Sequence, residues 1–127
     1  MGKPVNSDVK RVETFALNTK VNKEVLDKFR DCCSYYGYPM NVMLETFMRQ
    51  YVNGKFNIED DDIFKWENDT SKEIDVLSTT LNKEIYSNFK FTCKVKGNYI
   101  KHVVTAFMDK FTNGNFVLEY VDNSDEK

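Results

Sequence analysis

The sequence holds few of the residues from which catalytic and metal sites are built. His102 is the one histidine among 127 residues, so neither a histidine-based triad nor a multi-histidine metal site can form within one chain. The five glycines form neither a phosphate-binding loop nor a nucleophile elbow. The acidic run of residues 60–62 lacks the spaced oxygen ligands and the closing glutamate of a calcium loop. We therefore expect neither an enzyme nor a bound metal or cofactor.

Long hydrophobic runs are also lacking. The apolar residues recur periodically and never approach the roughly 18 in succession that a membrane-spanning helix needs. Residues 1–6 contain no apolar stretch of the kind found in signal peptides. The odd set of cysteines, Cys32, Cys33 and Cys93, favours a reducing cytoplasm and free, buried thiols. For the adjacent pair Cys32-Cys33, a redox role is the alternative.

A strong positive charge is missing as well. The net charge is −2, which at first disfavours a nucleic-acid partner. The acidic excess, however, lies in residues 60–72 and 120–127, whereas residues 1–59 and 73–119 are mildly basic. This distribution gives weak support to an anionic partner bound by the basic segments.

What the chain does contain is an internal repeat. Residues 13–59 align without a gap with residues 73–119 at a constant offset of 60, with 15 identities in 47 pairs. Two copies of this size are too few for a solenoid and too small for two separate cores. We expect one pseudo-two-fold symmetric domain over residues 13–119, the single-chain equivalent of a homodimer.

Three further segments flank the copies. Residues 1–12 are polar and predict a flexible arm, residues 60–72 an acidic connector, and residues 120–127 an acidic tail. The connector also contains Phe64 and Trp66, which a simple tether would not need. We expect it to be partly ordered, with one of these aromatic side chains packed on the domain.

Each copy has the pattern of one strand followed by two helices. In the first copy, residues 15–21 alternate apolar and polar side chains, Asn22 suits a helix N-cap, and Gly37 suits a helix end. A second apolar helical stripe begins at Met40 and ends at Asn53-Gly54. The second copy repeats these features at 75–81, Asn82, Gly97, Ile100 and Asn113-Gly114.

A single strand in each copy is not stable alone, because its backbone groups would stay unpaired on both edges. The simplest solution pairs the two strands antiparallel within the chain. The result is a mainly α fold in which a two-stranded ribbon lies on four helices; a dimer that exchanges strands between two chains is the alternative. The outward face of the ribbon would consist of Ala16, Asn18, Lys20, Val76, Ser78 and Thr80.

This pattern resembles the ribbon-helix-helix superfamily, to which the Arc, CopG and MetJ repressors belong. The resemblance rests on the strand alternation, the segment Val21-Asn22-Lys23-Glu24-Val25-Leu26-Asp27 and the two helices that follow. It appears twice and covers about 94 of 127 residues. It implies two modules fused in tandem, which bind double-stranded DNA with the ribbon in the major groove. Because the fused pair supplies both strands, we expect a monomer, and any higher-order association would come from adjacent modules on DNA.

The resemblance also implies roles for individual residues. The six outward side chains of the ribbon would read bases, and the N-termini of the second helices would hold backbone phosphates. The residues at those helix ends are Met40, Asn41, Ile100, Lys101 and His102. Two features depart from the family: Pro39 removes one amide, and the second strand begins with Asp75 and has no basic residue.

Several readings stay open at this point. Asn18 and Lys20 also suit an ordinary solvated strand face, and His102 an ordinary surface position. The resemblance implies a transcriptional repressor, or an accessory DNA-binding protein of partition or conjugation in a plasmid or phage setting. The rival is an antitoxin-like or inhibitory protein-interaction module that keeps the fold without binding DNA. The acidic net charge and the neutral second strand favour that rival.

Overall fold

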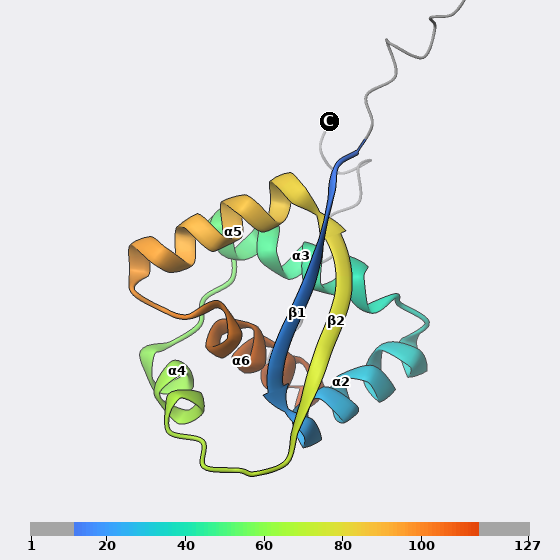
Figure 1. Cartoon of the computed structure of the whole chain (residues 1–127), viewed down its shortest axis with the longest axis vertical. Coiled ribbons are helices and arrows are strands. Elements are labelled where there is room, and N and C mark those ends of the chain that lie inside the picture. Colours follow the sequence, from blue (N-terminus) through green and yellow to red (C-terminus); the bar gives the residue numbers. More distant parts are fainter. Residues whose placement is uncertain (1–11, 115–127) are drawn as a thin grey trace, which may run out of the picture.

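The computed structural model describes residues 12–114, which form two strands and five helices (Figure 1). In chain order these are β1 (Thr14–Asn22), α2 (Lys23–Tyr36), α3 (Met40–Val52), α4 (Asp60–Glu67), β2 (Ile74–Asn82), α5 (Lys83–Lys96) and α6 (Ile100–Thr112). The fold is mainly helical with a two-stranded antiparallel sheet, as predicted. None of the helices within the described residues has the length and apolar content needed to cross a membrane. Residues 1–11 of the predicted arm, and residues 115–127 with the acidic tail, lie outside the described residues.

The element bounds of the first repeat recur in the second. β1 and β2 each have 9 residues, α2 and α5 each have 14, and α3 and α6 each have 13. Each element of the second set begins 60 residues after its counterpart in the first. The strand–helix–helix order expected for each repeat is therefore present twice, and both strands are one residue longer at each end than the alternation predicted.

Local sequence signals set the ends of α2 and α5. The side-chain oxygens of Asn22 and Asn82 accept a hydrogen bond from the N–H of the third helical residue, each at 3.0 Å. Such a cap satisfies an amide that has no partner inside the helix and stabilises by about 1 kcal/mol. Both helices end because Gly37 and Gly97 adopt φ angles of 77° and 79°, which side chains other than glycine rarely tolerate.

The two strands pair along their whole length. They run antiparallel, with Asn18 opposite Ser78 at the midpoint of the ladder. At each end the ladder continues by one backbone hydrogen bond, of 3.0 Å or 2.8 Å, from the first helical residue of one repeat to the residue before the other strand. The inner face of the ribbon buries Leu17, Val21, Leu77 and Leu81.

Aromatic rings fill the centre of the core beneath the ribbon. Phe47 of α3 stacks on Phe107 of α6 with ring centroids 4.2 Å apart. Phe29 packs edge-on against Phe107 at 5.7 Å, and Phe89 against Phe47 at 5.6 Å. α2 lies on α6 and α3 lies on α5, so each helix contacts a helix of the other repeat. The backbones of α3 and α6 approach each other less closely, because the stacked rings hold them apart.

The connector forms α4, which docks on α6. Ile63 is 4% exposed, and Trp66 packs against the core as a partly buried side chain. Phe64, in contrast, is 64% exposed. Of the two aromatic side chains expected to pack on the domain, Trp66 is therefore the one that does so. Two ion pairs of 3.2 Å and 3.3 Å also join the helices, Lys65–Asp109 and Asp62–Lys110.

The three thiols were all expected to be buried, and one of them differs from that expectation. Cys32 is half-buried, whereas Cys33 and Cys93 are buried as expected. Burial raises the pKa of Cys33 to about 11 and that of Cys93 to about 12, so both thiols stay protonated at neutral pH. This chemistry disfavours a redox role for the cysteine pair.

The ring cluster gives a direct test of the core. Phe47→Ala removes a fully buried ring that contacts Phe89 and Phe107, so we expect the free energy of unfolding to fall by about 3–5 kcal/mol in a urea titration. Phe64→Ala is the matched control and should stay within about 0.5 kcal/mol of the parent. Equal effects of the two substitutions would contradict this packing.

Candidate nucleic-acid interface

The outer face of the ribbon is open to solvent. It consists of the six positions that the alternation predicted, all of which are exposed: Ala16, Asn18, Lys20, Val76, Ser78 and Thr80. They face outward because side chains along a strand alternate, and their neighbours point into the core. Figure 1 shows the ribbon crossing the front of the molecule with the helices behind it. The described helices therefore leave this face free for a partner.

The two side chains at the midpoint of the ribbon bind each other. The hydroxyl of Ser78 donates a hydrogen bond to Oδ1 of Asn18 at 2.6 Å. This bond occupies the amide oxygen of Asn18 and leaves the two N–H donors of the same amide for another acceptor. Sequence reasoning treated the two residues as separate readers and missed this link, although the repeat offset of 60 places them at equivalent positions.

Asp75, the second residue of β2, points away from the outer face. Its carboxylate accepts a hydrogen bond from the N–H of Val76 at 2.7 Å and pairs with the Arg30 guanidinium of α2 at 3.3 Å. The backbone hydrogen bond, followed by Arg30, lowers the pKa of Asp75 below its usual value. Asp75 would disfavour an anionic partner on the outer face, but its carboxylate is paired with Arg30 on the helix side of the ribbon.

The second helices begin where the sequence placed them. α3 starts at Met40 after Pro39, and α6 starts at Ile100 after Tyr99. Neither preceding residue caps its helix with a side-chain hydrogen bond, so no capping side chain competes with a ligand for the first-turn amides. Met40 and Ile100 pack their side chains on the core, and only their backbone can face a ligand.

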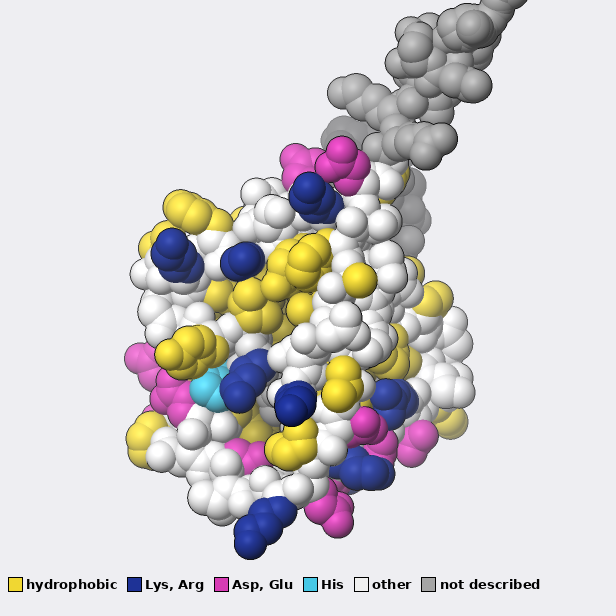
Figure 2. All heavy atoms as spheres, in the orientation of Figure 1, with side chains coloured by type: hydrophobic (Ala, Val, Ile, Leu, Met, Phe, Trp, Pro, Cys, Tyr) yellow, Lys and Arg dark blue, Asp and Glu magenta, His cyan; other side chains and the backbone are white. Residues whose placement is uncertain are grey.

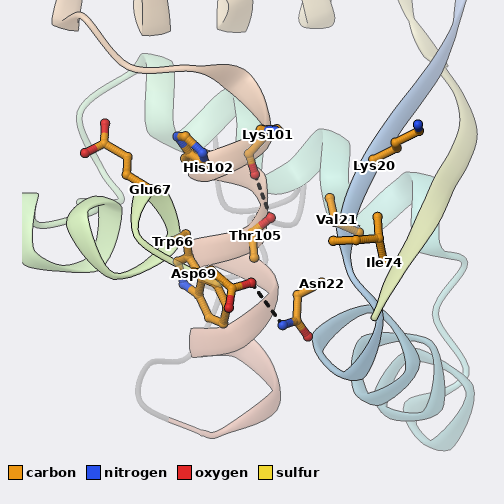
Figure 3. Close-up of a pocket in the computed structure, with 10 residues that line it drawn as sticks. All are labelled: Lys20, Val21, Asn22, Trp66, Glu67, Asp69, Ile74, Lys101, His102 and Thr105. Atoms are coloured by element: carbon orange, nitrogen blue, oxygen red, sulfur yellow. Dashed lines mark hydrogen bonds between the residues drawn. The ribbon is translucent and has the colours of Figure 1, made fainter. Parts of the chain in front are cut away.

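Each of these helix ends lies beside one end of the ribbon. The N-terminus of α6 faces the C-terminal end of β1 across a pocket of about 140 Å³ (Figure 3). Two exposed lysines from different elements, Lys20 and Lys101, line this pocket with His102. Glu67 and Asp69 line its far side, and Asp69 accepts a hydrogen bond of 3.2 Å from Asn22. The pocket therefore has a basic rim toward the ribbon and an acidic rim toward α4.

The surroundings of His102 in this pocket disfavour its charged form. Its Nδ1 atom is buried and has no hydrogen-bond partner. Burial lowers the pKa of His102 below its usual value of 6.5, the Lys101 ammonium lowers it further, and Glu67 opposes the shift. An anion bound between Lys101 and His102 would instead favour the charged imidazolium.

The opposite end of the ribbon lacks these charges. There Thr80 takes the place of Lys20, and Asn41 and Val42 take the places of Lys101 and His102. Near this end the Glu45 carboxylate accepts a hydrogen bond of 2.6 Å from the backbone N–H of Asn82, the N-cap residue of α5. Figure 2 shows dark-blue basic side chains gathered beside the cyan histidine on the ribbon face. The interface is therefore basic at one end, whereas the Glu45 carboxylate lies near the other.

Residues 12–114 contain no group of three or more His, Cys, Asp or Glu side chains that could hold a metal ion. Comparisons of the chain with protein-family models, curated proteins and solved structures found no match.

The environment of His102 predicts a pH effect on stability. Because the pKa of His102 is lower in the folded chain than in the unfolded one, the unfolded state binds the proton more readily. We expect the free energy of unfolding to fall as the pH drops below about 6.5, and His102→Gln to lose this part of the dependence. Urea titrations of both proteins between about pH 7.5 and 5.5 measure the difference. Parallel pH profiles would show that His102 is not buried in this way.

Proposed function

We propose that this protein binds double-stranded DNA sequence-specifically, with its β-ribbon in the major groove. The observation that carries the proposal is an exposed, two-stranded antiparallel ribbon with a polar centre, supported from behind by helices. The major groove is about 12 Å wide and admits such a ribbon, and alternate side chains of the strands can then reach base edges. The helices behind the ribbon would keep it rigid as it enters the groove.

In this proposal the chain consists of two fused ribbon-helix-helix modules, which are related by a pseudo-two-fold axis. Two contacts support the axis. Asn18 faces Ser78 in the ladder, and Phe47 stacks on Phe107 in the core. Both pairs join residues 60 apart, that is, equivalent positions of the repeat. A two-fold axis requires contacts of this kind where equivalent residues meet on it.

The ribbon residues divide into recognition roles by their chemistry. Lys20 suits the acceptors of guanine, and the free N–H donors of Asn18 suit a base acceptor such as adenine N7. Ser78 orients Asn18 through its 2.6 Å hydrogen bond, and Thr80 can donate or accept. Ala16 and Val76 offer apolar contact to a thymine methyl group. The two strands thus present different readers, which favours an asymmetric DNA site.

The charges of the interface favour the same asymmetry. At one end, Lys101 and the amides of α6 can hold phosphates next to Lys20, while the other end offers mainly the amides of α3. The phosphate contacts should concentrate on one half of the site. Each chain would supply a complete ribbon and act in the cytoplasm as a transcriptional repressor or as an accessory protein of plasmid partition or conjugation.

A protein-interaction role is the second candidate. It is favoured by the apolar content of the ribbon surface, where Ile74 is 48% exposed and Val76 is 40% exposed. An antitoxin-like or inhibitory module would use such a surface against another protein. A salt titration of DNA binding separates the two candidates, because phosphate contacts release counterions.

For the DNA-binding proposal we expect binding to mixed duplex DNA at low salt that weakens as salt is added. With about two phosphate contacts, the affinity should fall about tenfold between about 50 and 200 mM salt. Fluorescence anisotropy with a labelled duplex measures this slope. If the folded protein does not bind DNA even at low salt, the interaction module becomes the better proposal.

Substitutions of exposed residues should separate base reading from phosphate contact. Lys20→Ala should cost about 1–3 kcal/mol at the preferred site and relax specificity at one base pair. Asn18→Ala should relax specificity with little change in the salt slope, because it carries no charge. Lys101→Ala should weaken binding to all sequences alike and make the slope shallower.

Lys55→Ala is the matched control, since Lys55 is an exposed lysine in the turn after α3, outside the ribbon and the pocket. All four variants should keep the stability of the parent within about 0.5 kcal/mol. If Lys20→Ala folds and binds with normal affinity and specificity, the ribbon does not contact the DNA bases.

A further inference from the structure

Two clusters of exposed apolar side chains lie where the first helix of each repeat ends. The α2–α3 corner consists of Tyr35, Tyr36 and Tyr38, which are 82%, 59% and 50% exposed. The α5–α6 corner consists of Phe91, Val95 and Tyr99, which are 66%, 69% and 72% exposed. None of these six side chains lies on the ribbon, although Tyr99 is the N-cap residue of α6 and borders the proposed phosphate site. Exposed aromatic groups of this kind are typical of protein interaction sites.

The side chains of the α2–α3 corner are arranged as a unit. The rings of Tyr35 and Tyr36 pack edge-on with centroids 5.0 Å apart, and those of Tyr36 and Tyr38 stack at 6.3 Å. Tyr35 has few rotatable bonds, so placing its ring in an interface costs little conformational entropy. The three rings therefore form a preformed surface.

The two corners have opposite charges. Asp31 lies one turn before Tyr35 on α2, and the last turn of α2 contains no basic residue, so the negative pole of the helix is not compensated. The last turn of α5 instead contains Lys94 and Lys96. Lys96 lies 5.6 Å from the ring of Tyr51 in its own chain.

Asp31 and Lys94 are both available to a partner. Within residues 12–114, neither of these exposed side chains forms an ion pair. Asp31 is followed four residues later by Tyr35, and Lys94 lies between Phe91 and Val95 along α5. Each charge thus sits next to exposed apolar side chains of its own corner.

The corners lie on opposite sides of the molecule. In Figure 1 the turn between α2 and α3 is at the right edge and the turn between α5 and α6 is at the left edge, with the ribbon between them. Figure 2 shows hydrophobic side chains at both edges, with basic side chains near α5. A copy placed beside the molecule can therefore present one corner to the other while both ribbons stay uncovered.

We propose that the α2–α3 corner of one copy docks on the α5–α6 corner of the next, so that copies associate head to tail. Asp31 of one copy pairs with Lys94 of its neighbour, and the tyrosines pack on Phe91 and Val95. A second copy is the occupant because the chain itself supplies both an acidic and a basic apolar corner. Contacts between two different patches repeat openly instead of closing into a dimer. This inference does not rest on DNA binding.

The contact is small, so the association is weak and reversible, and it becomes visible at high protein concentration. Sedimentation equilibrium of the protein without DNA at low salt measures it. We expect Asp31→Lys alone and Lys94→Glu alone each to weaken self-association by about tenfold, because each places like charges together at every contact. A mixture of the two variants, or one chain with both substitutions, should restore it. Lys72→Glu makes the same charge change in the loop before β2 and should have no effect.

A second pair of variants tests the direction of the contact. Tyr35→Ser blocks one corner and Phe91→Ser blocks the other, so each alone should stay monomeric, while an equimolar mixture should stop at dimers. Circular dichroism confirms that each variant is folded, since all the changed side chains are exposed. Three results would each overturn the proposal: a parent protein that stays monomeric at the highest concentration, association that neither charge reversal weakens, or association that only one of them weakens. None of these results bears on DNA binding, which is measured separately.

Discussion

The rest of the structure depends on the need of each strand for a partner. Each repeat contains one strand, and the backbone groups of a lone strand have no partner on either edge. Pairing β1 with β2 satisfies one edge of each and joins the two repeats along nine residue pairs. Once the strands are paired, the helices that follow them leave from opposite ends of the ribbon. The first helix of one repeat then lies on the second helix of the other, so neither repeat has a core of its own.

Much of this arrangement could be predicted because its signals are local or periodic. The N-caps at Asn22 and Asn82 and the glycines that end α2 and α5 are decided within a few residues of the chain. The alternation along the strands decides which side chains face outward. Because of the repeat, each strand and helix is predicted twice, once from each copy. A propensity that is weak in one copy becomes convincing when it recurs 60 residues later.

The features that could not be predicted all depend on contacts between distant segments. Arg30 and Asp75 are 45 residues apart, and their pairing follows only from the way α2 passes under β2. Ile63 is the most buried residue of α4, yet it is no more conspicuous in the connector sequence than the exposed Phe64. The charge difference between the ribbon ends likewise required knowing which helix lies beside which strand. The sequence pattern predicts whether a side chain faces the core or the solvent, but its contacts with distant residues follow only from the packing of the elements.

The separation of the two strands along the chain has a consequence for biosynthesis. β1 ends at residue 22 and its partner ends at residue 82, so the nascent chain carries an unpaired apolar strand until the last residues of β2 have left the ribosome. At about 5–20 residues per second, the delay of 60 residues lasts roughly 3–12 seconds. During that time the first strand, with Leu17 and Val21 exposed, can pair with the same strand on a neighbouring nascent chain. Synthesis on crowded polysomes is therefore the stage at which this fold is most open to misassembly.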